Sequence, residues 1–238
     1  LKYFIFLTSL LSLSSCAGQT NVIKSLQNVK KSVLKIETWA KVQGCDIDAC
    51  IDYSLLSTGT GTVVLHSYDK AVLTAAHICV QNKYKMIEGP PLDYRFKGID
   101  RNNKEYVLEI LKYDVKADIC LLRSVSGGLE PPHVRMSGKT PEYSERFYNL
   151  AAPVGVIDGE MVPIYQGRYF GISNGRAFYG MPAIGGSSGS PIVNFKGELV
   201  GMVHSVHYRF HHITLSATYS RLWNFLNVER IRIIEVRN

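Results

Sequence analysis

Short apolar segments separated by glycine, asparagine and aspartate run through most of the 238-residue chain. Segments of this kind are typical of β-strands, and long stretches of helical periodicity are nearly absent. In the first half we expect strands at Ser32–Ala40, Leu55–His66, Ala71–Thr74, Tyr94–Asp100, Lys104–Tyr113 and Asp118–Arg123. In the second half we expect them near Tyr148–Ala152, Met161–Ile172, Arg176–Tyr179, Ser190–Asn194, Glu198–Ser205 and Ile213–Ala217.

A segment rich in glycine, proline and serine, residues 124–147, separates the two groups of strands. Glycine and proline interrupt regular structure, so this segment is the natural crossing between two β units. We therefore predict an all-β fold with a first β-barrel over 32–123 and a second over 148–227. The second unit ends in a helix at Tyr219–Asn227, and residues 228–238 form a tail.

The beginning of the chain has the pattern of an export signal. Lys2 precedes an apolar run, residues 4–13, that is too short to span a bilayer. Residues 1–16 end in Leu13-Ser14-Ser15-Cys16, which resembles the lipobox of bacterial lipoproteins, where the cysteine carries the lipid. Cleavage after Ala17 is the alternative, because the residues before it have the small-x-small form. We expect an exported protein, anchored in the cell envelope or periplasm by a lipid on Cys16, or secreted.

Residues 17–31 are expected to form a tether with a lead-in helix, because Val22, Leu26 and Val29 have helical spacing. The net charge of +7 arises from basic residues scattered along the chain. Scattered charge favours solubility or weak attraction to an anionic surface rather than a nucleic-acid groove. We expect no nucleic-acid partner, no cofactor and no metal, and a monomeric protein.

The segment Gly185-Gly186-Ser187-Ser188-Gly189-Ser190-Pro191 precedes a short apolar run. A serine between glycines is typical of a tight loop that exposes a hydroxyl while its backbone amides turn toward the same place. Upstream, a helical turn at the end of Thr74–His77 would present the imidazole of His77, and Asp118 opens another apolar strand. Ser188, His77 and Asp118 are therefore candidates for a nucleophile, its base and the group that orients the base.

Apart from Cys16, the sequence contains four cysteines: Cys45, Cys50, Cys79 and Cys120. A disulfide between the first two would close a small loop. Cys79 lies two residues beyond His77, and Cys120 lies two residues beyond Asp118. A contact between His77 and Asp118 would therefore also bring the two thiols together. A second disulfide and two small buried thiols are both compatible with the sequence.

These segments resemble the trypsin-like, or chymotrypsin-fold, serine proteases, and they are most similar to the bacterial glutamyl-endopeptidase and HtrA-type branches. The resemblance extends over about residues 32–227 and rests on Thr74–His77, Asp118–Leu122, Gly186–Pro191 and Gly197–Val203. It implies two antiparallel six-stranded β-barrels with the active site in the cleft between them. The implied activity is that of an exported serine endopeptidase, which cleaves proteins or peptides through a Ser-His-Asp triad and an acyl-enzyme.

The resemblance also assigns an oxyanion hole to the backbone amides of Gly186 and Ser188, with Ser187 between them. Digestive relatives have an aspartate at the position of Ser187, which pairs with a newly cut N-terminus. Ser187 cannot form that ion pair, so we expect no activation by this route.

The substrate pocket follows from the same resemblance. Pro182 and Ala183 lie near the position of the acidic pocket base of trypsin, and neither carries a carboxylate, which disfavours arginine or lysine as substrate. His204, followed by Ser205, resembles the strand histidine of glutamyl endopeptidases, which could pair with a substrate glutamate. We therefore expect a preference for an acidic residue before the scissile bond.

Two other functions are compatible with the same residues. A protease fold without activity could be a binding module on the cell envelope, since folds often host changed functions. The segment Gly185–Gly189 also fits the G-x-S-x-G pattern of esterases, with Ser187 as nucleophile, but that class has the chain order serine, acid, histidine. The order here is His77, Asp118, Ser188, which favours the serine protease.

Overall fold

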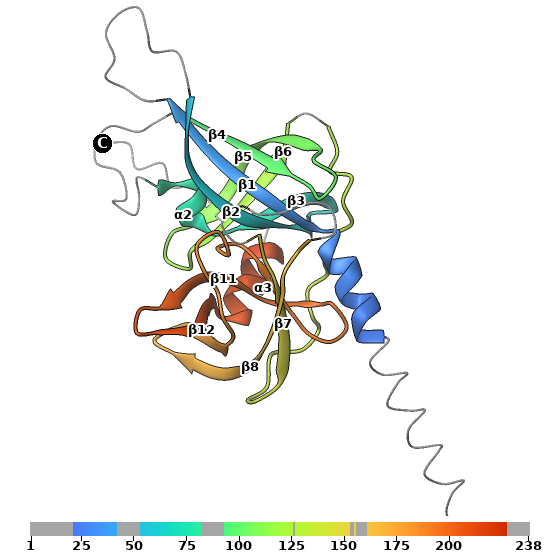
Figure 1. The fold of residues 1–238 in the computed structure, drawn as a ribbon, viewed down its shortest axis with the longest axis vertical. Helices are drawn as coiled ribbons and strands as arrows, with labels where there is room; N and C mark the ends of the chain where they lie inside the picture. Colours follow the sequence, from blue (N-terminus) through green and yellow to red (C-terminus); the bar gives the residue numbers. More distant parts are fainter. Residues whose placement is uncertain are drawn as a thin grey trace, which may run out of the picture.

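The computed structural model describes residues 21–41, 53–81, 93–125, 127–152, 155 and 161–227. Within these residues the chain forms two closed antiparallel barrels of six strands, so the predicted all-β fold is confirmed (Figure 1). The expected export signal 1–16 with Cys16, the loop with Cys45 and Cys50, and the tail 228–238 lie outside the described residues. Of the helices described, none has the length and apolar character needed to cross a membrane.

The first barrel consists of β1 (Val33–Lys41), β2 (Tyr53–His66), β3 (Asp69–Thr74), β4 (Tyr94–Ile99), β5 (Glu105–Asp114) and β6 (Ile119–Ser124). The sheet closes in the order β1-β2-β3-β6-β5-β4. Branched side chains suit the pleated strands, and those that face inward fill the barrel. The fully buried residues here include Leu34, Ile36, Leu73, Leu121 and Leu122.

The second barrel consists of β7 (Arg146–Leu150), β8 (Ile164–Ser173), β9 (Arg176–Gly180), β10 (Pro191–Val193), β11 (Leu199–His207) and β12 (Phe210–Ala217), followed by α3 (Tyr219–Asn227). It closes in the order β10-β11-β12-β9-β8-β7. An aromatic cluster fills its interior, where the Tyr179 ring lies 5.8 Å from Phe147 and 5.2 Å from Tyr169. Each barrel thus has a core of its own.

The observed strands differ from the predicted ones mainly at their ends. The hairpin of β11 and β12 is longer than the expected strands Glu198–Ser205 and Ile213–Ala217. Near its turn the ring of His207 lies 5.0 Å from Tyr208 and 5.3 Å from Phe210. Stacking of these rings supports pairing in a segment that has no alternation of apolar and polar residues.

Two helices each adjoin one barrel in the sequence and pack against the other barrel. Residues 21–30 are helical and lead into β1, yet the helix lies along the second barrel (Figure 1). Its buried residues are Leu26 and Val29, and Val29 packs on the β10–β11 turn, since a Cβ at Gly197 would lie 3.0 Å from Val29 Cγ2. A helix that begins the first barrel therefore also covers the second.

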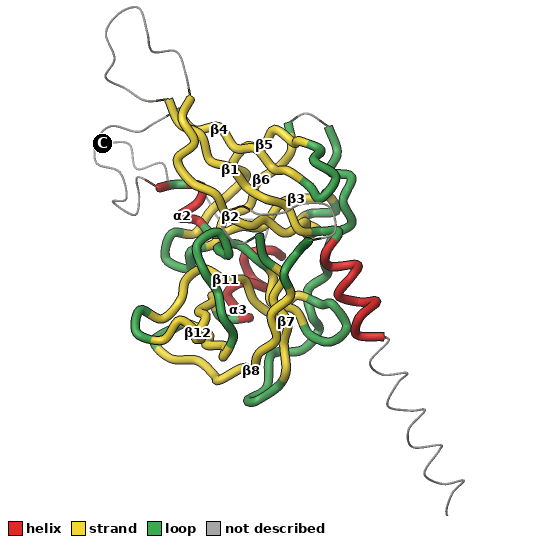
Figure 2. Tube along the Cα trace, viewed as in Figure 1, coloured by secondary structure: helices red, strands yellow, loops and turns green. Residues whose placement is uncertain are grey.

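Helix α3 follows the second barrel and packs against the first (Figure 2). Leu222, Phe225 and Leu226 have the spacing of one helix face, and all three are buried. The first barrel contributes hydrogen bonds to the end of α3: Lys112 Nζ donates to the Phe225 carbonyl, and His66 Nδ1 lies 2.7 Å from the Leu226 carbonyl oxygen. These contacts fix the two barrels relative to one another.

Candidate active site

His77 and Asp118 come together because the strands that carry them are neighbours. Helix α2 (Ala76–Cys79) directly follows β3, Asp118 directly precedes β6, and Thr74 pairs with Cys120 across these strands. The backbone N–H of His77 donates to Asp118 Oδ1 at 2.9 Å, and its Nδ1 lies 2.8 Å from Asp118 Oδ2. Both oxygens of the carboxylate are therefore held by His77.

The protonation of this pair follows from its chemistry. Asp118 has φ 56°, a left-handed conformation that aspartate tolerates better than most residues. Burial raises the pKa of Asp118, but hydrogen bonds and the charge of His77 outweigh burial, so the pKa is lowered. An ionised carboxylate only accepts, so Nδ1 of His77 must carry the proton. This tautomer places the basic lone pair of His77 on Nε2.

The cysteines next to these residues form a disulfide. Cys79 on α2 and Cys120 on β6 are bonded, with their Cα atoms 6.6 Å apart. The sequence was compatible with a disulfide or with two buried thiols at these positions, and the structure has the disulfide. The bond joins the elements that carry His77 and Asp118.

The serine loop leaves two backbone amides available. Ser187 N–H donates to the Ile184 carbonyl at 2.9 Å, and Ser190 N–H donates to the Ser187 carbonyl at 3.0 Å. Among the residues that the structure describes, no hydrogen bond uses the backbone N–H of Gly186 or of Ser188. The amides on either side of Ser187 thus have no internal partner among the described residues, as the predicted oxyanion hole requires.

The same loop is attached to the first barrel through Thr60 on β2. Thr60 N–H donates to the Ser188 carbonyl at 2.7 Å, and Thr60 Oγ1 donates to the Gly186 carbonyl at 2.7 Å. Gly189 has φ 90°, and a Cβ there would lie only 1.9 Å from the Thr60 carbonyl oxygen. Glycine is required at this position because both the conformation and the close approach exclude a side chain.

The backbone of Ser188 lies near α2, across β2. A Cβ at Gly59 would be 3.0 Å from the side chain of Ile78 and 3.2 Å from the Ser188 carbonyl oxygen. Ile78 follows His77, so the glycine in β2 allows both α2 and the serine loop to approach this strand closely. The structure thus brings all three candidate triad residues to the seam between the barrels.

Ser187, the nucleophile of the esterase interpretation, has a different environment. It is 1% exposed, and its Oγ accepts a hydrogen bond from Ile184 N–H at 3.3 Å. Ser188 is partly exposed. A buried hydroxyl with a local partner cannot readily reach a substrate, so the geometry disfavours Ser187.

Among the expected pocket residues, Ala183 is buried and Pro182 is partly buried in the segment before the serine loop. The structure places His204, on β11, against Asp118, with Nδ1 3.8 Å from Asp118 Oδ2 and 2.9 Å from Ser205 Oγ. Sequence reasoning missed this contact, since no local pattern signals it. Burial lowers the pKa of His204 to about 4, although the charge of Asp118 opposes the shift, so His204 is neutral at pH 7.

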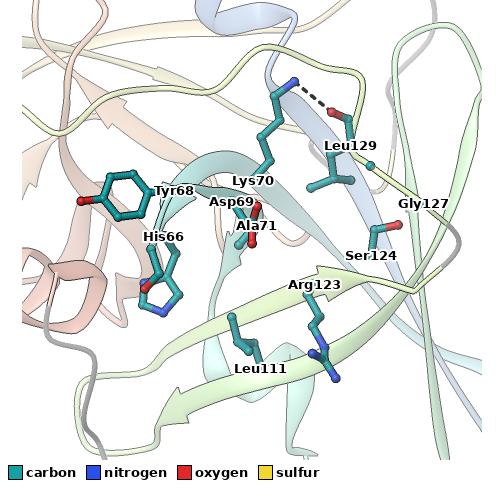
Figure 3. Close-up of a pocket in the computed structure, with 12 residues that line it drawn as sticks. His66, Tyr68, Asp69, Lys70, Ala71, Leu111, Arg123, Ser124, Gly127 and Leu129 are labelled. Carbon is teal, nitrogen blue, oxygen red and sulfur yellow. Dashed lines mark hydrogen bonds between the residues drawn. The ribbon is translucent and has the colours of Figure 1, made fainter.

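A separate cavity of about 630 Å³ lies on the first barrel around the β2–β3 turn (Figure 3). His66, Lys70 and Arg123 are among its lining residues, and Lys70 Nζ donates to the Leu129 carbonyl at 2.9 Å. None of the candidate triad residues lines it. The cavity is therefore separate from the candidate active site.

Solved structures with a similar fold include two bacterial proteins. Rv3671c from M. tuberculosis H37Rv, in an inactive mutant form, is 17% identical with a TM-score of 0.60, over 84% of this chain and 87% of that chain. A serine endoprotease from Yersinia pestis is 14% identical with a TM-score of 0.62, over 85% of this chain. The match spans 64% of the Yersinia chain. At such identities, these structures show a shared fold.

A comparison with curated protein sequences gave no match. The sequence does match the family described as trypsin-like peptidase domain, over residues 59–202. This match covers more than half of the chain and includes His77, Asp118 and Ser188. The chain therefore belongs to the trypsin-like peptidase domain family and is a serine endopeptidase.

Proposed function

We propose that Ser188, His77 and Asp118 act as the catalytic triad of this endopeptidase. The observation that carries the proposal is the double contact of His77 with Asp118, which fixes the imidazole in the tautomer of a general base. The position of the Ser188 backbone beside α2 supports it, as do the two available amides of the serine loop.

In this mechanism Ser188 Oγ attacks the carbonyl carbon of the scissile bond while Nε2 of His77 takes the hydroxyl proton. The ionised Asp118 stabilises the imidazolium, and the backbone amides of Gly186 and Ser188 hold the negative oxygen. Collapse of the tetrahedral intermediate breaks the C–N bond, and His77 gives its proton to the departing amine. A water molecule, deprotonated by His77, then hydrolyses the Ser188 ester and restores the enzyme.

A preference for an acidic residue before the scissile bond, as in the glutamyl-endopeptidase branch, belongs to the same proposal. Its support is the absence of a carboxylate at Pro182 and Ala183 and the presence of His204 on β11. Because His204 is neutral at pH 7, it would offer a substrate carboxylate a hydrogen bond rather than a full charge.

Export with a lipid on Cys16, and a monomeric state, are also proposed. Their support is the sequence alone: the apolar run at 4–13, the lipobox ending at Cys16 and the scattered charge. Mass spectrometry of the protein purified from its natural host would test the lipid. An N-terminus at Gly18 without added lipid would contradict it.

A fluorophosphonate probe tests the triad, because it labels an activated serine. We expect labelling of the wild type, and loss of labelling with a roughly 10⁴-fold fall in kcat/KM on peptide substrates in Ser188→Ala. Ser187→Ala is the matched control, and it should still be labelled. An unlabelled wild type would favour a binding module, and labelling that depends on Ser187 would favour the esterase.

A further inference from the structure

A cavity of about 500 Å³ adjoins the candidate triad on the side of Asp118. His77 and Asp118 form part of its wall, together with His204 and Ser205 of β11. Neither Ser188 nor Gly186 lines it. The cavity is therefore contiguous with the catalytic histidine but displaced from the place where the bond is cut.

Positive charge dominates the cavity wall. Lys116, Arg176 and Arg221 line it, and Asp118 is its only carboxylate among the described residues. Asp118 already binds His77 through both oxygens. Outside the cavity wall, Asp114 partly compensates Arg221, with 3.9 Å between Asp114 Oδ2 and an Arg221 guanidinium nitrogen.

Arg176 has no such compensation within the described chain. It is the first residue of β9, directly after the turn at Gly175, which has φ 71°. No ion pair or hydrogen bond joins the Arg176 side chain to another described residue, and the residue is exposed. Burial is the main cause of the lowered pKa of His204, and the charge of Arg176 adds to it. The positive charge of the Arg176 guanidinium therefore reaches His204, which lies beside Asp118 in the cavity wall.

The position of the cavity limits which substrate residue it can hold. The substrate residue at the scissile bond must lie beside Ser188 and the loop amides. Neither Ser188 nor Gly186 is part of the wall of this cavity, so the cavity does not hold that residue. An extended peptide advances about 3.3 Å per residue, with side chains alternating between faces. A side chain in the cavity therefore belongs to a residue two or more positions away from the cut.

We propose that this cavity binds the carboxylate of an aspartate or glutamate in the substrate, with Arg176 as the main recognition residue. The proposal rests on the proposed function, since it defines a substrate class for the same site. A guanidinium recognises a carboxylate through two parallel N–H···O bonds, a geometry that an unpaired arginine offers and a lysine does not.

The test uses peptides in which one glutamate is moved through four positions on each side of the cleaved bond, each compared with glutamine at the same position. For wild type we expect about a tenfold higher kcat/KM with glutamate at one position two or more residues from the cut. The advantage should shrink with added salt, because the cavity is open to solvent. Arg176→Glu should abolish the preference and favour lysine there.

Arg146→Glu is the matched control, since Arg146 is exposed on β7 and does not line the cavity. It should leave the preference unchanged. Equal cleavage of glutamate and glutamine peptides at every distant position would overturn the proposal. So would a preference for glutamate two or more residues from the cut that persists in Arg176→Glu.

Binding of the same peptides to Ser188→Ala, measured by fluorescence anisotropy, separates this proposal from the catalytic one. Tighter binding of the glutamate peptide than of the glutamine peptide supports the cavity, provided that the difference is lost when Arg176→Glu is added to Ser188→Ala. This result supports the cavity even if the wild type cleaves neither peptide. Cleavage by the wild type with no effect of the acidic residue on binding supports the triad and overturns the cavity.

Discussion

Among single residues, Asp118 has the most constrained environment in the site. It contacts His77 through two hydrogen bonds, and the imidazole of His204 lies 3.8 Å from Oδ2 on another side. His204 is 7% exposed and belongs to the other barrel. A neutral ring here covers part of the carboxylate without cancelling its charge, which favours a strong interaction of Asp118 with His77.

Burial of His204 should make the stability of the protein depend on pH. Its pKa is about 4 in the folded protein, against an ordinary value of 6.5. Between these values the unfolded chain binds a proton that the folded chain does not, so the free energy of unfolding falls with falling pH, by on the order of 3 kcal/mol. His204→Gln should lack this contribution. Urea denaturation of both proteins between about pH 7 and pH 4 measures it.

Other groups, among them His133 and Asp118, affect the comparison in known directions. The pKa of His133 is also lowered, by burial and by the charges of Arg135 and Lys70, so it adds a slope of the same sign to both proteins. The pKa of Asp118 is lowered from 3.8, so its stabilising contribution is lost only below that pH window. Parallel pH curves for wild type and His204→Gln would refute a role for His204.

Among the elements, α2 and β6 depend most on one another. Helix α2 has only 4 residues, too few to be stable by itself, yet it carries His77. The Cys79–Cys120 disulfide ties it to the strand that follows Asp118. A short helix is thereby held at a fixed distance from the carboxylate that orients its histidine.

Removal of this disulfide should lower both stability and activity. The cysteines are 41 residues apart, and a loop of that length corresponds to about 4 kcal/mol in the chain-entropy description. We expect Cys79→Ala with Cys120→Ala to lower the free energy of unfolding by about that amount and to reduce kcat, as measured by urea denaturation and peptide cleavage.

Dithiothreitol provides the control for that double variant. Both proteins in this comparison carry Cys45→Ser and Cys50→Ser. The reductant should lower the free energy of unfolding of the protein that retains Cys79 and Cys120. It should not change that of the protein in which both are alanine. Equal urea midpoints for all these proteins, with and without reductant, would show that the bond contributes nothing to the fold.

In the whole molecule, the site depends on how the two barrels meet. The first barrel supplies His77 and Asp118, and the second supplies Ser188. Thr60 joins them, because its hydroxyl donates to the Gly186 carbonyl and accepts from Ala152 N–H at 3.0 Å. The helix at 21–30 and α3 each cross to the opposite barrel, which reinforces the same seam.

Thr60→Val should therefore impair activity more than folding. The substitution keeps the shape of the side chain but leaves the partly buried Gly186 carbonyl and the buried Ala152 N–H without their partner, at a cost of about 1–3 kcal/mol. We expect at least a roughly tenfold lower kcat/KM, because the serine loop loses a bond to the first barrel.

Thr58→Val, on the same strand, is the control and should have little effect on either quantity, since its hydroxyl makes no hydrogen bond among the described residues. Peptide cleavage and thermal denaturation measure the two effects. Wild-type activity in Thr60→Val would show that the seam bond does not position the loop.

The sequence by itself determined the elements and the candidate residues, because apolar periodicity and turn chemistry are local properties. The expected strand at Leu55–His66 corresponds to β2 at Tyr53–His66, and the expected helix at Tyr219–Asn227 is α3. The glycines around Ser188 indicated a tight loop for the same reason, because the backbone conformations that favour glycine can be inferred from the local sequence.

Only the tertiary structure decided the contacts between distant segments. His204 meets Asp118, and Arg176 reaches the cavity beside them, because strand order and register in two closed barrels place β9, β11 and the turn before β6 together. Register and barrel closure depend on pairings across many residues, and no local pattern in the sequence encodes the distances that result.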